Sequence, residues 1–216
     1  MERTPRSPRG LSLTEVLVTA VPLLVFLAGV YAVFGPGCGA YPSETGIAEV
    51  EAQARRLVDR LAQEFQGAGV GTLDAVGSLE RGARETTFRR NQGFSGGAVQ
   101  WGPTARLRFV REPGEEDNGI DDDGDGLVDE GILELRRDLG AEGDPSVTLS
   151  RGVGEFLAGE SGNGLDDNGN GLVDEPGLCL TLEGRLLTVR VTLERPDGTG
   201  SVLRGSAEAS VFLRNL

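Results

Sequence analysis

The chain has 216 residues, which suits one domain of moderate size with an accessory segment better than a two-domain enzyme. Its formal net charge is −13, from 34 acidic and 21 basic residues, and this argues against nucleic acid as a direct partner because phosphate binding needs clustered positive charge. The sequence contains no histidine, the side chain most often used as a general base at neutral pH. We therefore expect a protein that is not an enzyme.

The amino-terminal segment combines a short basic leader with a long apolar run. Residues 1–10 contain three arginines and a single acidic residue, and the 19 residues 16–34 carry no charge. As a helix rising about 1.5 Å per residue, this run nearly spans the roughly 30 Å hydrocarbon core of a bilayer. The sequence therefore predicts a transmembrane helix over 11–34, with the amino terminus in the cytoplasm and the acidic remainder of the chain on the other side.

The residues at the start of this run are unusual for a plain membrane anchor. Glu15 stands at the entrance of the apolar stretch, where a carboxylate is costly unless it finds a partner. The sequence from Gly10 and Leu11 to Glu15 resembles the processing site of type IV prepilins and of type II secretion pseudopilins. In that family a prepilin peptidase cuts after the glycine, the new terminus is N-methylated, and the fifth mature residue is Glu. The resemblance implies a leader peptide over 1–10 and cleavage before Leu11, although Leu11 stands where the family usually has Phe.

The same resemblance implies a function and a set of partners. A minor pilin or pseudopilin is a structural subunit of a type IV pilus-like or type II secretion filament, and Glu15 would pair with the terminal amine of a neighbouring subunit. The implied partners are other pilin or pseudopilin subunits, the prepilin peptidase and the inner-membrane assembly platform. The implied location is the bacterial inner membrane as a single-pass protein, with a periplasmic C-terminal domain near a filament tip. The general layout looks most like the J-type minor pseudopilin or the W-type minor pilin.

Two other interpretations of this segment remain open. The first is a signal-anchored extracytoplasmic protein, calcium-binding and structural or adhesive, that belongs to no filament. The second is a lipoprotein, because Cys38 follows the hydrophobic stretch. Gly35 and Pro36 fit the apolar residues expected before a lipidated cysteine poorly.

The region after the apolar run predicts a break in the helix, followed by an amphipathic helix. Gly35, Pro36 and Gly37 predict a break, and Ser43 is a candidate N-cap for a restart. Beyond it, apolar residues recur at spacings of three and four, the pattern of one helix face, up to a stop at Gly67. We expect a stem over 35–67.

The rest of the chain, 68–216, shows the features of an exported β-rich domain. Alternating patterns predict strands over 105–109 and 187–193, and the turn residues at 195–200 predict that the chain closes with a hairpin. The expected fold class is α+β. The resemblance makes this pilin-like: a long N-terminal transmembrane and amphipathic helix packed on an antiparallel sheet with long Asp/Gly loops.

Two segments of the chain repeat one another. Residues 118–130 recur 45 positions later as 163–175, with ten of thirteen residues identical and only Ile/Leu and Asp/Asn exchanges among the others. Each copy places oxygen-bearing side chains at alternate positions and then a glycine, so that three side chains can converge on one ion. We therefore predict metal loops over 117–130 and 162–175.

The predicted ligands follow from this spacing, with a backbone carbonyl from each leucine. They are Asp121, Asp123, Asp125, Leu127, Asp129 and Glu130 in the first loop, and Asp166, Asn168, Asn170, Leu172, Asp174 and Glu175 in the second. The pattern resembles the first half of an EF-hand loop, but Ile132 or Gly177 stands where that loop ends in Glu. It looks like the Asp-rich loops of thrombospondin type 3 repeats and dockerins, which implies calcium. The second loop has fewer carboxylates and is expected to bind more weakly.

Cys38 and Cys179 are the chain's two cysteines. On the exported side they could form a disulfide or remain independent thiols, and the sequence leaves both open.

Overall fold

The computed structural model describes residues 13–75, 78–140 and 146–214, without the side chains of Glu15 and of 33–44. The chain divides into two compact units, 1–44 and 45–216. The elements in chain order are α1 (Leu13–Gln66), the 3-10 turn η1 (Val70–Thr72), β1 (Asp74–Ala75), β2 (Glu85–Ser95), β3 (Ala98–Arg111), β4 (Gly131–Arg136), β5 (Ser146–Val153), β6 (Leu178–Glu183), β7 (Leu186–Pro196) and β8 (Val202–Phe212).

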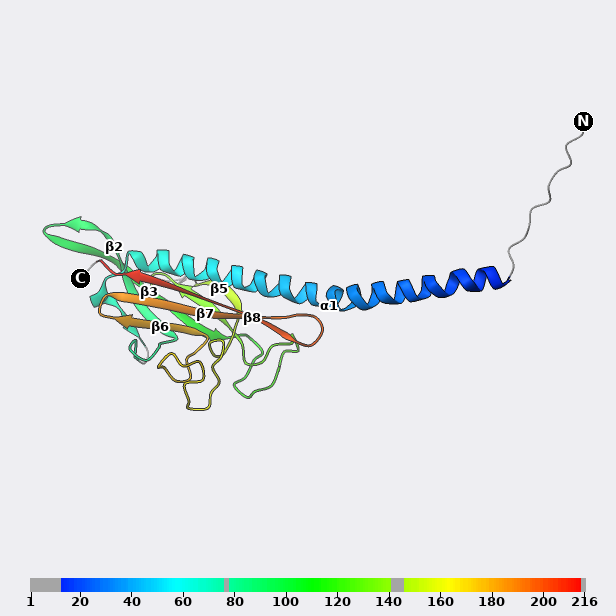
Figure 1. Ribbon diagram of the computed structural model, residues 1–216. Coiled ribbons are helices and arrows are strands. Elements are labelled where there is room, and N and C mark those ends of the chain that lie inside the picture. The colour runs from blue at the N-terminus through cyan, green and yellow to red at the C-terminus, as the bar shows by residue number, and fades with distance from the viewer. Residues whose placement is uncertain (1–12, 76–77, 141–145, 215–216) are drawn as a thin grey trace, which may run out of the picture. The chain divides into compact units, whose positions relative to one another are not determined.

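The eight strands form one antiparallel sheet in the order β1-β2-β3-β4-β5-β7-β6, and β8 pairs with β7. Strands β7 and β8 make the closing hairpin that the sequence predicts, in register from Leu186 opposite Phe212 to Pro196 opposite Val202. The expected strands over 105–109 and 187–193 lie within β3 and β7. The two Asp-rich segments are the connections from β3 to β4 and from β5 to β6 (Figure 1).

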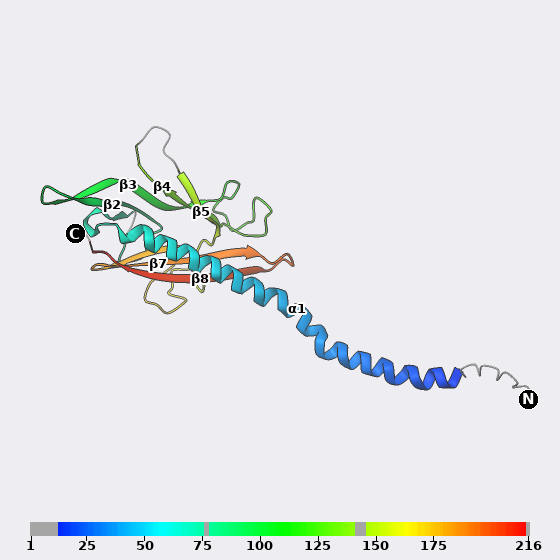
Figure 2. The same ribbon diagram turned by 90° about the horizontal axis from the view of Figure 1, so that it is seen from above.

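The core of the second unit lies between the C-terminal part of α1 and the sheet, where that part of the helix lies across the strands (Figure 2). The helix contributes one face, with apolar side chains three or four residues apart, as an amphipathic helix should. The buried helix residues are Val50, Ala54, Leu57, Val58, Leu61 and Phe65. The ring of Phe65 packs against that of Phe88 from β2, with centroids 4.7 Å apart.

The first unit contains the start of α1, and its apolar side chains are exposed. Leu13 is 80% exposed, Val18 72% and Tyr31 78%. The backbone of α1 runs without interruption through Gly35, Pro36 and Gly37, where the sequence predicts a break. Pro36 removes one helical hydrogen bond and crowds the carbonyl four residues before it, and α1 continues past this local cost.

The predicted fold class requires a correction at the membrane-spanning segment. Within the part of the chain that the structure describes, no helix combines the length and the apolarity needed to cross a membrane. The prediction of a transmembrane helix over 11–34 is therefore wrong, and with it the prediction of a single-pass inner-membrane protein. The described fold consists mainly of the antiparallel sheet.

Candidate metal centre

The first Asp-rich loop is folded by hydrogen bonds from its own backbone to its own carboxylates. Asp121 accepts hydrogen bonds from the N–H groups of Gly124 and Gly126, at 2.7 and 3.0 Å. Both glycines have positive φ, 79° and 97°, a conformation that few other residues adopt. Asp123 and Asp125 each use one oxygen, Oδ1, to accept a backbone N–H two residues further on. The chain is thus curled so that these carboxylates turn toward the inside of the loop.

Glu130 closes the loop from the buried side. Its side chain has no exposed surface, and neither carboxylate oxygen has a hydrogen-bond partner among the residues that the structure describes. Carboxylate oxygens of Glu130, Asp123 and Asp125 lie within 4.8 Å of one another. Burial, together with the charges of Asp125, Glu115 and Asp123, raises the pKa of Glu130 to about 7. A buried carboxylate without a donor is unfavourable unless it is protonated or neutralised by a cation.

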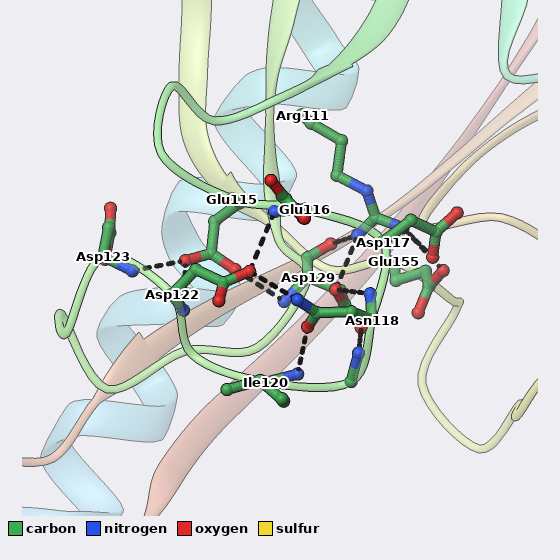
Figure 3. Close-up of polar contacts among 11 residues, drawn as sticks. Arg111, Glu115, Glu116, Asp117, Asn118, Ile120, Asp122, Asp123, Asp129 and Glu155 are labelled. Atoms are coloured by element: carbon green, nitrogen blue, oxygen red, sulfur yellow. Dashed lines mark hydrogen bonds and ion pairs between the residues drawn. The ribbon is translucent and has the colours of Figure 1, made fainter.

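Glu115 has a structural role that the sequence analysis missed. Its Oε1 accepts the N–H groups of Asp122 and Asp123, both at 2.9 Å, and its Oε2 accepts that of Asp129 at 3.2 Å (Figure 3). Since both oxygens already bind N–H groups, we assign Glu115 to holding the loop's shape. Glu160 does the same in the second loop, accepting the N–H groups of Asn168 and Asp174. The signal was present in the sequence, because the two glutamates are separated by the same 45 residues as the two loops.

Asp129 and Asp174 were both predicted as metal ligands, but their carboxylates accept backbone N–H groups from the start of their own loops. Asp129 accepts the N–H groups of Asn118 and Gly119, at 3.0 and 2.7 Å, and has a positive φ of 54°. Asp174 has a φ of 52° and accepts the corresponding N–H groups of its own loop at 3.0 Å. After this turn, Glu130 lies close to Asp123 and Asp125, and Glu175 contacts the side chain of Asn170.

The second loop repeats this architecture with fewer charges. Asp166 accepts the N–H groups of Gly169 and Gly171, and Glu175 is fully buried with Oε2 unpartnered. The other oxygen of Glu175 accepts a hydrogen bond from the side-chain amide of Asn170. The amide oxygens of Asn168 and Asn170 accept backbone N–H groups, as the aspartates at these places do in the first loop.

Three groups of acidic side chains among the described residues could hold a metal ion, and all three include residues of the first loop. The first group consists of Glu115, Asp121 and Asp123, and both carboxylate oxygens of Glu115 already accept backbone N–H groups. The second, Asp117 with Asp129 and Glu155, surrounds the guanidinium of Arg111, which supplies the compensating charge. The third consists of Asp123, Asp125 and Glu130. Only this last group contains a fully buried carboxylate with two unpartnered oxygens, so it is the best candidate for a metal centre.

The other predicted site residues fall outside this centre. Gly10 and Leu11 lie outside the described residues, and Glu15 lies in α1 without a described side chain. Cys179 is a buried free thiol in β6. Burial, with the charge of Glu175, raises the pKa of this thiol to about 11, so it is protonated at neutral pH. The side chain of Cys38 is not among those described.

Comparison of the chain with models of protein families, with curated proteins and with solved structures gives no match.

Proposed function

We propose that this protein is a non-enzymatic structural subunit of the pilin-like class, and that calcium ions bound in its two Asp-rich loops stabilise its β-rich unit. The calcium proposal depends most on Glu130. A carboxylate with no exposed surface and no described donor to either oxygen, beside two further carboxylates, is stabilised in its charged form by a bound cation.

The donor set favours calcium over other cations. It consists of carboxylate and amide oxygens, with no histidine in the chain, and Cys179 is protonated at neutral pH. Such a set suits a hard cation with six to eight oxygen ligands, whereas transition metals prefer nitrogen or sulfur. Magnesium holds its waters more firmly and demands a stricter octahedron, so it fits a loop of this kind less well. The carbonyl oxygens of Leu127 and Leu172 are the proposed backbone ligands.

The pilin-like assignment rests on the amino-terminal sequence and on the surface of α1. The apolar side chains from Leu13 to Tyr31 are exposed, and a helix that is apolar on several sides is normally covered by other helices. In a filament of the pilin type, the corresponding helices of other subunits would provide this cover. The sequence at Gly10, Leu11 and Glu15, which resembles a prepilin processing site, supports the same assignment.

Mass spectrometry of the protein from cells with an active prepilin peptidase tests the subunit assignment. The proposal predicts a chain that begins at N-methylated Leu11, and a Gly10→Val variant should keep residues 1–10. An unprocessed wild-type chain would contradict it. A chain beginning at a modified Cys38 would instead identify a lipoprotein.

A second candidate is a calcium-binding structural or adhesive protein outside any filament. It requires only a unit with a core of its own, and the residues of the core cluster all lie in the unit 45–216. Purified filaments separate the two candidates, because the leading proposal requires the protein to co-purify with other pilin-like subunits. The second candidate predicts that it does not.

A further inference from the structure

The two Asp-rich loops are joined through one arginine. Arg111 is the last residue of β3, at the point where the chain enters the first loop, and its side chain is 21% exposed. Figure 3 shows its guanidinium between the end of the first loop and Glu155, which belongs to the segment that leads into the second loop.

The contacts of Arg111 with the first loop hold that loop's two ends. Its Nη2 lies 2.6 Å from Oδ1 of Asp117, at the start of the loop. Its Nη1 donates to the backbone carbonyl of Asp129 and lies 3.7 Å from that residue's carboxylate. Asp129 directly precedes Glu130, the buried carboxylate of the candidate metal centre. A displacement of Glu130 is therefore transmitted to a residue that Arg111 holds.

The contact with the second loop passes through Glu155. Arg111 Nη2 donates to Glu155 Oε1 at 2.9 Å. The backbone of the Glu155 segment is paired with the end of the second loop: Gly177 donates to the carbonyl of Glu155 at 2.8 Å, and Leu157 donates to that of Glu175 at 2.9 Å. Glu175 is the second loop's own buried carboxylate.

We propose that the two loops bind their cations cooperatively, with the Arg111–Glu155 ion pair as the connection between them. This inference rests on the proposed calcium sites. A cation in the first loop fixes Glu130 and, through Asp129, the position of Arg111. The arginine then holds Glu155 and the backbone opposite Glu175, so that the second loop loses less conformational freedom when it binds its own cation. Direct repulsion between two bound cations acts in the opposite direction and is screened by salt.

Calcium titration calorimetry on the chelator-treated full chain tests this coupling. In the otherwise wild-type chain, Glu130→Gln removes the first site and should weaken calcium binding by the second loop by about fivefold or more. Thermodynamic reciprocity requires that Glu175→Gln weaken the first site by the same factor. In a Glu155→Gln background, neither substitution should change the affinity of the remaining site.

Glu155→Gln is preferred to a substitution of Arg111 for a physical reason. Without the guanidinium, Asp117, Asp129 and Glu155 would form an uncompensated carboxylate group able to attract a cation of its own. Arg111→Gln therefore serves as the second variant and should show a loss of coupling together with extra weak binding. Arg108→Gln is the matched control, because Arg108 lies on the same strand and pairs with Glu134 at 2.8 Å. It should leave the coupling intact.

The failures of the two proposals are distinguishable. If both loops of the wild-type chain bind calcium and each affinity is independent of the other site, the coupling is disproved and the calcium sites stand. Coupling that persists unchanged in Glu155→Gln and Arg111→Gln also overturns the proposed connection. If the wild-type chain binds no calcium, the proposed function itself fails, and the coupling with it.

Discussion

The side-chain amide of Asn170 donates a hydrogen bond to the buried carboxylate of Glu175. In the first loop the corresponding residue is Asp125, which cannot donate and instead brings a second negative charge within 4.8 Å of Glu130. The second loop thus satisfies one oxygen of its buried carboxylate internally, whereas in the first loop neither oxygen of Glu130 has a hydrogen-bond partner among the described residues. The two loops share a backbone arrangement and differ in how far their own side chains compensate the buried carboxylate.

Replacing Asn170 with Asp should therefore strengthen the second site. The substitution removes the internal donor to Glu175 and adds one ligand charge, and ligand charge is a main determinant of calcium affinity in such loops. We expect calcium binding by the second loop to tighten by about tenfold or more, measured by titration calorimetry in a Glu130→Gln background. Asn91→Asp adds the same charge on β2, outside both loops, and should leave the affinity unchanged. Equal affinities for Asn170→Asp and its parent would refute the assigned difference between the loops.

Glu130→Gln should change stability in opposite directions with and without calcium. In the metal-free protein at pH 8 the substitution removes an uncompensated buried charge, so the free energy of unfolding should rise by about 1–3 kcal/mol. With millimolar calcium the wild-type chain gains binding free energy that the variant lacks, so the order should reverse. Thermal unfolding followed by circular dichroism in chelator and in calcium measures both. A variant less stable than wild type in both conditions would show that Glu130 is only a packing residue.

The stability of the metal-free protein should fall as pH rises. The pKa of Glu130 is raised from 4.5 to about 7 in the folded state, so between these values the folded chain binds more protons than the unfolded chain. The contribution of Glu130 to the free energy of unfolding is most favourable below pH 4.5. It falls by an amount on the order of 3 kcal/mol as the pH rises through 7. Urea unfolding in chelator at several pH values measures this slope, which should flatten in Glu130→Gln. An equal slope in both proteins would assign the effect to other groups.

Glu115 and Glu160, which accept backbone N–H groups of the two loops, should stabilise the fold whether or not a metal ion is bound. Glu115→Gln replaces a carboxylate that accepts three N–H groups by an amide that can accept with one oxygen only. We expect a loss of about 1–3 kcal/mol in the metal-free protein, and a smaller loss for Glu160→Gln, since Glu160 is less buried. Glu116→Gln, at the exposed neighbouring position, is the matched control and should change stability little. Stability equal to wild type in Glu115→Gln, measured by denaturant unfolding, would remove the assigned role.

The features that the sequence predicts well are those with a local, repeated pattern. The helix face from Val50 to Phe65 and the β7–β8 hairpin follow from periodicity and turn residues, because neighbours in sequence determine both. The internal repeat likewise points to the convergence of Asp123 and Asp125, which depends on alternate spacing within a few residues.

The features that the sequence does not predict depend on three-dimensional context. Alternation alone cannot distinguish Asp129 from Glu130, and only the positive φ of Asp129 turns one toward the backbone and the other toward the site. The contact between Arg111 and Glu155 joins residues 44 positions apart, a distance at which no local pattern indicates pairing. The predicted break at Pro36 was wrong because residue propensity is a weak guide within a long helix.

The most direct test of the account is to count the calcium ions bound by the full chain and to identify the loop that holds each. Titration calorimetry of chelator-treated protein in millimolar magnesium should show two calcium sites per chain. The tighter site should disappear in Glu130→Gln and the weaker one in Glu175→Gln. No calcium binding, or two sites that survive both substitutions, would contradict the account.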